Sequence, residues 1–239
     1  MSSGSLREGF KELLWPTRCV CCNIEGELLC SSCRTRLPWI DQRLACPVCG
    51  APLGFLTCTE CKHDWLTRAC VCAFPFRGVG AQLTTALKDG HELRLAPVVA
   101  AAIATALDEA SGWPACDGLP RFDATAIDAL CYVPATRAAY LRRGFDHMEL
   151  VARELSWVLS IPLADVLVRE AGRDQRLLGR RDRAQNLSGS VDVLGDVTGM
   201  RLLLADDVVT TGASMNACAE ALLARGARSV TSCSLARVW

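Results

Sequence analysis

The adjacent acids Asp206 and Asp207 are followed at once by hydroxyl side chains and a glycine, in the motif TTGAS at residues 210–214. The apolar run before the acids, 202–205, predicts a buried strand, and the run at 215–224 predicts a helix. A turn between a strand and a helix directs backbone N–H groups and the positive helix end at a bound phosphate. The hydroxyls add donors, and the carboxylates accept from ribose hydroxyls. The segment therefore predicts a sugar-phosphate site.

Two other interpretations of this motif are less favoured. A Walker A loop needs the sequence GK[ST] after its glycines, and no lysine follows Gly212. An ordinary strand, turn and helix with an aspartate cap would share part of the pattern. Because Asp-Asp followed by Thr-Thr-Gly rarely occurs by chance after a buried strand, the ligand-binding interpretation is preferred.

Four Cys-x-x-Cys pairs lie in the first quarter of the chain. Each such turn points two thiolates at one place, and two turns complete a tetrahedral zinc site. Gaps of seven and eight residues within each half, against twelve between the halves, favour one zinc per half. Spacing alone leaves a cross-braced pairing open. In sequential pairing, the first site holds Cys19, Cys22, Cys30 and Cys33, and the second holds Cys46, Cys49, Cys58 and Cys61.

These two zinc sites are expected to be structural, because four thiolates leave no open position for catalysis. A segment this short buries little apolar surface, so metal would supply its folding free energy. A thiol redox module is disfavoured because the pairs come as a set of four. Cys21 could compete with Cys22 as a ligand, and His63 is expected to be exposed. Other cysteines are expected to be buried small hydrophobes: Cys70, Cys72, Cys131, Cys218 and Cys233.

The composition is that of a globular protein without a marked charge. The chain has 239 residues, is 51% hydrophobic and has a formal net charge of zero, which gives no argument for nucleic acid or membrane. The N-terminus lacks an apolar signal region, and the most apolar stretch, 97–107, is too short to span a bilayer. Fifteen cysteines without an export signal predict a reducing, cytoplasmic location and metal rather than disulfides.

Cysteines become sparse near residue 73, which suggests a zinc-ribbon domain at 1–73 and a second domain at 74–239. In the second part, helical and strand-like segments alternate, which predicts an α/β fold with a parallel sheet and flanking helices. Ligands of such sheets bind beyond the carboxyl ends of the strands. Strands are expected at 69–76, 126–133, 202–205 and 229–238, and helices at 82–88, 97–110, 148–159 and 215–224.

The motif at 202–214 resembles the phosphoribosyl pyrophosphate signature of type I phosphoribosyltransferases. From about residue 13 to residue 237, the chain resembles the ComF-type family of late-competence and GntX-like phosphoribosyltransferases. Its departures are Asp146, where asparagine is frequent, Ala205, often valine, and a K-x-x-G element shortened by one residue. Besides the doubled cysteine motif, the resemblance rests on Leu87-Lys88-Asp89-Gly90, Val133-Pro134, Arg137, Arg143-Gly144-Phe145-Asp146-His147, Gln175, Leu178, Arg183 and Asn186.

This resemblance implies a type I phosphoribosyltransferase fold that binds phosphoribosyl pyrophosphate with Mg2+ and displaces pyrophosphate from the ribose anomeric carbon. Cationic side chains would stabilise the leaving group, with Arg142 a further candidate and Arg183 on a closing flap. The arginines at 137–143 are expected on a loop. Catalytic roles are implied for Asp206, Asp207, Arg143 and Arg183. Ligand binding is implied for Asp206, Asp207, Val208, Val209, Thr210, Thr211, Gly212, Ala213, Ser214, Lys88 and Arg137.

The acceptor nucleophile is not legible from the sequence, and a non-catalytic alternative exists. The family's link to competence implies a helicase-type partner and single-stranded DNA, so the chain could instead be a ligand sensor or a scaffold in DNA uptake. Trp39 and Trp65, with Arg34 and Arg36, could supply stacking and charge to a nucleic acid. Tryptophan is as easily a core residue.

Overall fold

The computed structural model describes residues 16–61, 64–169 and 191–239. The sequence predictions for five residues lie outside these ranges: His63, Gln175, Leu178, Arg183 and Asn186.

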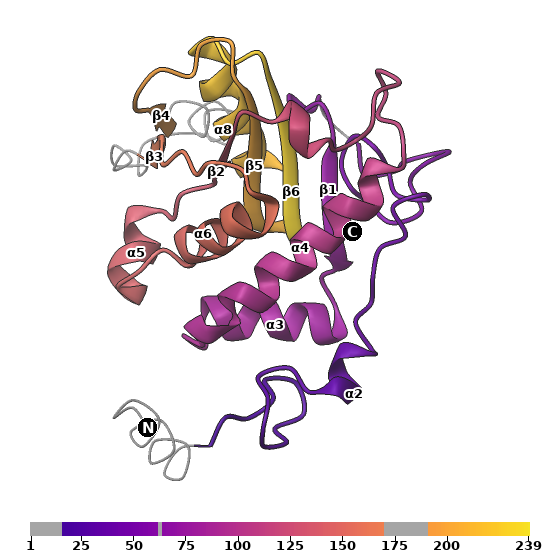
Figure 1. Ribbon diagram of the computed structural model, residues 1–239, viewed down its shortest axis with the longest axis vertical. Coiled ribbons are helices and arrows are strands. Elements are labelled where there is room, and N and C mark those ends of the chain that lie inside the picture. The colour runs from indigo at the N-terminus through magenta and orange to yellow at the C-terminus, as the bar shows by residue number, and fades with distance from the viewer. Residues whose placement is uncertain (1–15, 62–63, 170–190) are drawn as a thin grey trace, which may run out of the picture.

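A four-stranded parallel sheet in the order β1-β6-β5-β2 forms the centre of the molecule (Figure 1). Its strands are β1 (Cys70–Pro75), β6 (Ser229–Arg237), β5 (Arg201–Val209) and β2 (Ala129–Tyr132). In β1 and β2 every residue is buried, and in β5 and β6 nearly every one is. A parallel sheet covered on both faces needs such continuous apolar strands. The sheet confirms the predicted α/β class.

Helices cover both faces of this sheet. The helices α3 (Gly78–Lys88), α4 (Ala96–Ser111) and α6 (His147–Leu159) lie on one face, and α8 (Ala213–Ala224) lies on the other (Figure 1). Successive side chains of β5 point to opposite faces: Leu203 packs with the three helices and Leu204 with α8. Within the described ranges, no helix is long and apolar enough to cross a membrane.

The predicted strands and helices are all present, but two local predictions are wrong. β5 does not end before the acids; it continues through Asp206 and Asp207 to Val209, because its end pairs in register with β6. The arginines at 137–143 lie on a short helix, α5 (Arg137–Arg143), and not on a loop. Thr136 caps α5 by accepting from Ala139 N, and Gly144 ends it with a φ of 81°.

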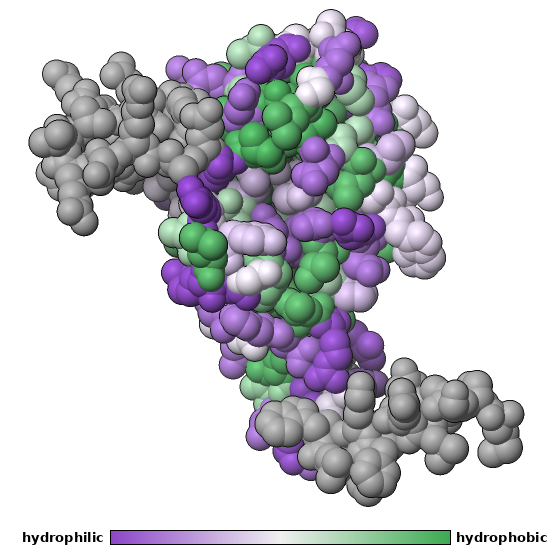
Figure 2. Space-filling model, turned by 90° about the vertical axis from the view of Figure 1, so that its left-hand side faces the viewer, coloured by the Kyte–Doolittle hydropathy of each residue, from purple (hydrophilic) through white to green (hydrophobic). Residues whose placement is uncertain are grey.

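Several shorter elements were not predicted, because too few residues carry a periodic pattern in them. The strands β3 (Leu167–Arg169) and β4 (Val191–Val193) pair antiparallel. The helix α2 (Ser31–Arg34) follows Cys30. Two 3-10 turns, Leu93–Leu95 and Ala124–Ala126, precede α4 and β2. The face that carries α5 mixes hydrophilic and hydrophobic residues (Figure 2).

The two halves of the cysteine-rich segment lie at different places on the α/β body (Figure 1). Cys19, Leu29 and Cys33 share the core of the layer that holds α3 and α4. The second half forms its own small cluster around Cys46 and Cys49, beside the sheet edge, where Cys70 N donates to Pro47 O at 3.2 Å. β1 begins at Cys70, inside the segment proposed as the first domain, and the division at residue 73 stays a prediction.

Candidate ligand site and cysteine clusters

A cavity of about 500 Å³ opens at the carboxyl ends of β2 and β5. This is where a parallel α/β sheet binds its ligands, because the loops there are free to differ in sequence. Polar side chains reach the cavity from separate elements: α3, α5, α6 and β5 with the turn that follows it. They include Lys88, Arg143, His147, Asp206, Asp207, Thr210 and Ser214.

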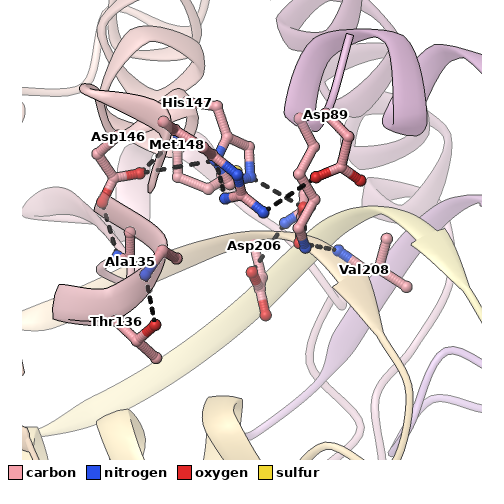
Figure 3. Close-up of polar contacts among 12 residues, drawn as sticks. Asp89, Ala135, Thr136, Asp146, His147, Met148, Asp206 and Val208 are labelled. Atoms are coloured by element: carbon pink, nitrogen blue, oxygen red, sulfur yellow. Dashed lines mark hydrogen bonds and ion pairs between the residues drawn. The ribbon is translucent and has the colours of Figure 1, made fainter. Parts of the chain in front are cut away.

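Asp207 is held by two partners from different helices. Its Oδ2 atom lies 2.8 Å from Lys88 Nζ, at the end of α3, and 2.9 Å from His147 Nε2, at the start of α6. Its Oδ1 atom accepts from Val208 N at 2.7 Å (Figure 3). Burial by itself would raise the pKa of Asp207, but the His147 hydrogen bond and the Lys88 charge outweigh it and hold the pKa well below its usual range. Asp207 is therefore ionised at neutral pH.

The pKa of Asp206 is shifted in the opposite direction. Its side chain is buried, none of the ion pairs among the described residues includes it, and its Oδ1 atom accepts from Asp207 N at 2.9 Å. Burial, and then the negative charge of Asp207, raise the pKa of Asp206 well above its usual range. Two neighbouring acids whose environments push their pKa values apart can hold one proton between them.

A chain of polar contacts runs from Asp207 through His147 and Arg143 to Asp89, at the end of α3. Arg143 is nearly buried and donates to Asp89 Oδ1 at 3.3 Å, while its other terminal nitrogen lies 3.4 Å from His147 Nδ1 (Figure 3). Because a guanidinium only donates, His147 Nδ1 accepts and Nε2 carries the hydrogen that Asp207 accepts.

Asp146 fixes the position of His147. Its Oδ1 atom accepts from Met148 N at 2.9 Å as the N-cap of α6, and its Oδ2 atom accepts from Ala135 N at 2.6 Å. This ties the start of α6 to the loop after β2. From the sequence, His147 is recognised only as part of a family motif and has no predicted role. Its one local signal is its place directly after a helix-capping aspartate.

The predicted ligand-binding residues fall into two groups. Lys88, Arg143, Asp206, Asp207, Val208, Thr210 and Ser214 line the cavity. Val209 and Gly212 are buried beside it, while Thr211 is exposed and its hydroxyl accepts from Ala213 N at 3.3 Å. Arg137 and Arg142 are exposed on α5 and do not line the cavity, and Arg183 lies outside the described residues.

The eight cysteines of the four Cys-x-x-Cys pairs form two groups, and the grouping is sequential. In each group the four Sγ atoms lie within 4.8 Å of one another; the groups are Cys19, Cys22, Cys30, Cys33 and Cys46, Cys49, Cys58, Cys61. The shortest Sγ–Sγ distances are 3.5 Å. Zinc–sulfur bonds of about 2.3 Å in a tetrahedron require about 3.8 Å between sulfurs, so these thiol sets fit a closed zinc site. Cys21 is outside the first group.

Hydrogen bonds reach two thiols of the first group, Cys19 and Cys33. Arg36 donates to Cys33 Sγ at 3.2 Å, and Cys30 N faces Cys19 Sγ at 3.5 Å. Burial raises the pKa of the Cys19 thiol, but main-chain hydrogen bonds from Cys30, Cys21 and Cys22 outweigh it and lower the pKa to about 6. The cysteines predicted to be core residues are buried in the sheet and in α8: Cys70, Cys72, Cys131, Cys218 and Cys233.

Comparison with known proteins gives sequence relatives. Residues 138–238 match the family described as the phosphoribosyl transferase domain. DNA utilization protein YhgH of Salmonella typhi is 28% identical over 210 residues, which cover 84% of this chain and 87% of that protein. Competence protein F of Haemophilus influenzae is 30% identical over 115 residues, 46% of this chain and only 50% of that protein.

Solved structures give weaker likenesses. Hypoxanthine phosphoribosyltransferase from Trypanosoma cruzi is 14% identical, with a TM-score of 0.32 over 66% of this chain and 68% of that one. Phosphoribosylpyrophosphate synthetase from Mycobacterium smegmatis is 21% identical, with a TM-score of 0.29 over 46% of this chain and 28% of that one. Scores this low do not establish structural equivalence.

Proposed function

Because the chain belongs to the ComF-type phosphoribosyltransferase family, we propose that its cavity binds phosphoribosyl pyrophosphate with Mg2+. One observation carries the proposal: an acidic pair, a hydroxyl-rich turn before a helix, and the cations Lys88 and Arg143 line one cavity. Each matches one part of that ligand, namely the ribose hydroxyls, the 5-phosphate and the pyrophosphate.

In the proposed complex, the turn at 210–214 holds the 5-phosphate with its amides, its hydroxyls and the start of α8. Asp206 and Asp207 accept from the ribose hydroxyls. Burial raises the pKa of Asp206 in the free protein, so a ligand that binds its ionised carboxylate would favour release of a proton from it. Apart from the cysteine groups, no three metal-ligating side chains converge in the described residues, so oxygens of the ligand itself would complete the Mg2+ shell.

As a transferase, the protein would join a nucleophile to the anomeric carbon while the bond from that carbon to pyrophosphate breaks. The pyrophosphate would leave with the bonding electron pair, and a bound Mg2+ would supply positive charge to it. Lys88 and Arg143 would stabilise the charge that develops on the leaving group. Asp206 and Asp207 would hold the sugar rather than act as hydrolytic acids. Positioning and charge stabilisation would supply most of the rate.

Two structural zinc ions complete the proposal, one in each four-cysteine group. The names of the relatives, competence and DNA utilization, support a role in DNA uptake. A helicase-type partner and single-stranded DNA enter the proposal through the family resemblance of the sequence. Of Trp39 and Trp65, Trp39 is the one exposed enough to stack on a base: it is 42% exposed, and its ring lies edge-on to that of Phe74 with 4.7 Å between the ring centroids. Trp65 packs against the buried cluster of Cys46, Cys49 and Ala51.

Calorimetric titration with phosphoribosyl pyrophosphate, with and without Mg2+, tests the proposal. Binding should require Mg2+, and Asp206→Asn with Asp207→Asn should abolish it. Asp108→Asn, an exposed acid on α4 outside the cavity, is the matched control. Release of pyrophosphate with an acceptor base or ammonia would establish a transferase, whereas binding without release would establish a sensor. A wild-type protein that gives no heat with Mg2+ present would refute the proposal.

A further inference from the structure

The turn at 210–214 is supported from behind by the segment that follows the second cysteine group. Trp65 packs directly on Gly212: a Cβ atom on that glycine would lie 2.5 Å from the indole Cη2 atom. Gly212 also has a φ of 81°, a conformation that suits glycine. The same indole packs against the core formed by Cys46, Cys49 and Ala51. One side chain thus touches both the second cysteine group and the proposed phosphate turn.

A pair of hydrogen bonds joins the same two regions. Asn216, in the first turn of α8, donates from Nδ2 to Asp64 O at 2.9 Å, and its Oδ1 atom accepts from Leu66 N at 3.2 Å. Both groups of the amide are therefore used to hold the backbone on either side of Trp65. A side-chain amide satisfied in this way fixes the spacing between the two backbone segments.

Arg237 makes a third connection, from the end of β6. Its buried guanidinium donates from Nε to Cys49 O at 2.9 Å and from a terminal nitrogen to Val209 O at 3.2 Å. The same terminal nitrogen also donates to Thr210 O and Val238 O. Within the described ranges it has no carboxylate partner. A zinc ion with four thiolates carries a net negative charge, which would balance this buried cation.

The first cysteine group has no comparable link. Its core residues Cys19 and Cys33 pack with α3 and α4. In the described part of the chain, no hydrogen bond joins the segment 16–37 to the turn at 210–214. Two groups with nearly the same spacing therefore have different neighbours.

We propose that the second cysteine group, when it holds zinc, positions the phosphate turn through Trp65, Asn216 and Arg237, and that the first group does not. Trp65 and Arg237 contact the turn, and Asn216 holds the backbone on either side of Trp65. None of the three lines the cavity, so they are positioning residues. This inference rests on the proposed function for its ligand, but the mechanical link between cluster and turn does not depend on it.

The decisive comparison uses two pairs of variants in the full chain. Cys46→Ser with Cys58→Ser and Cys19→Ser with Cys30→Ser should each lower the zinc content from two ions to one. Only the first pair should speed amide hydrogen exchange at residues 208–216 and weaken phosphoribosyl pyrophosphate binding by about tenfold or more. Equal effects of the two pairs on exchange at the turn would overturn the proposal.

A milder variant covers the case in which loss of the second zinc unfolds the chain. Asn216→Ala should keep two zinc ions and the native circular dichroism, yet weaken binding by about tenfold and speed exchange at the turn. Trp157→Leu, an 80% exposed tryptophan on α6, is the control and should change neither. If wild-type protein binds and Asn216→Ala binds equally well, this inference fails while the proposed function stands. If the wild-type protein does not bind phosphoribosyl pyrophosphate, the proposed function fails. The hydrogen-exchange data then decide by themselves whether the second cysteine group positions the turn.

Discussion

The ligand site and the cysteine groups each bring acidic side chains close together, and they compensate the resulting charge in different ways. In the site, Asp207 is compensated by Lys88 and His147, and Arg143 by Asp89, so that protein groups hold one another in place. In each cysteine group the Sγ atoms of four thiols lie within 4.8 Å of one another, and four thiolates this close are favourable only around a cation. The site is thus preorganised by the fold, while the cysteine groups need an ion.

The largest effect expected from this comparison is that of metal removal. Dialysis against a strong chelator at neutral pH should release about two zinc ions per chain and unfold the segment 16–61, since each structural zinc contributes on the order of 10 kcal/mol of folding free energy. Elemental analysis and thermal melting measure this, with added zinc as the reversal control. If the protein contains no zinc, or melts identically after chelation, the cysteine groups do not depend on a metal ion.

Asp207→Asn should have the next largest effect, because it leaves Lys88 without its counter-charge. We expect a loss of about 2 kcal/mol at pH 7, below the value for a fully buried pair because the Lys88 side chain is 33% exposed. The pKa of Asp207 is lowered by folding, so its contribution is present above about pH 4 and is lost as pH falls further. Urea unfolding at several pH values tests both statements.

The matched control for Asp207→Asn is Glu149→Gln, which removes an exposed ion pair with Arg153 on α6. It should cost about 0.5 kcal/mol or less. Equal losses from Glu149→Gln and Asp207→Asn would mean that the pair of Asp207 and Lys88 contributes no more to stability than an exposed ion pair.

Asp206→Asn should act in the opposite direction on stability. Folding raises the pKa of Asp206, so the native state carries a proton that the unfolded state lacks, and this costs free energy as pH rises above about 4. The free energy of unfolding of the asparagine variant should be about 1 kcal/mol higher at pH 7, as is typical when a strained functional residue is replaced. Ligand binding should be lost. A variant less stable than wild type at pH 7 would show that Asp206 is not held protonated.

Thr136→Ala should have the smallest effect. It removes the cap of α5, the helix that carries Arg143 into the cavity, and should cost about 0.5 kcal/mol because the helix is short and exposed. Thr136→Ser keeps the hydroxyl and should behave as wild type. Weaker binding of phosphoribosyl pyrophosphate in the alanine variant alone, followed by calorimetry, would link the cap to the site.

Local patterns in the sequence predicted much of the fold. Continuous apolar runs such as 202–205 indicated strands buried on both faces, and the short gaps within each half of the cysteine segment predicted the sequential grouping. The motif TTGAS predicted a turn into a helix, and α8 begins there. Each of these features is encoded within about a dozen residues, so spacing alone reveals it. The same locality led to the errors at β5 and α5, whose bounds depend on β6 and on a single threonine cap.

The contacts between distant segments were decided by the tertiary structure. His147 and Asp207 are 60 residues apart, and they meet because β2 and β5 are neighbours in the sheet, which puts the start of α6 beside the end of β5. From the sequence, Trp65 could be a core or a base-stacking residue; in the structure it packs both against the core around Cys46 and Cys49 and on Gly212. Strand order brings such residues together, and strand order is set by the packing of the whole sheet between its helices, which no short stretch of sequence encodes.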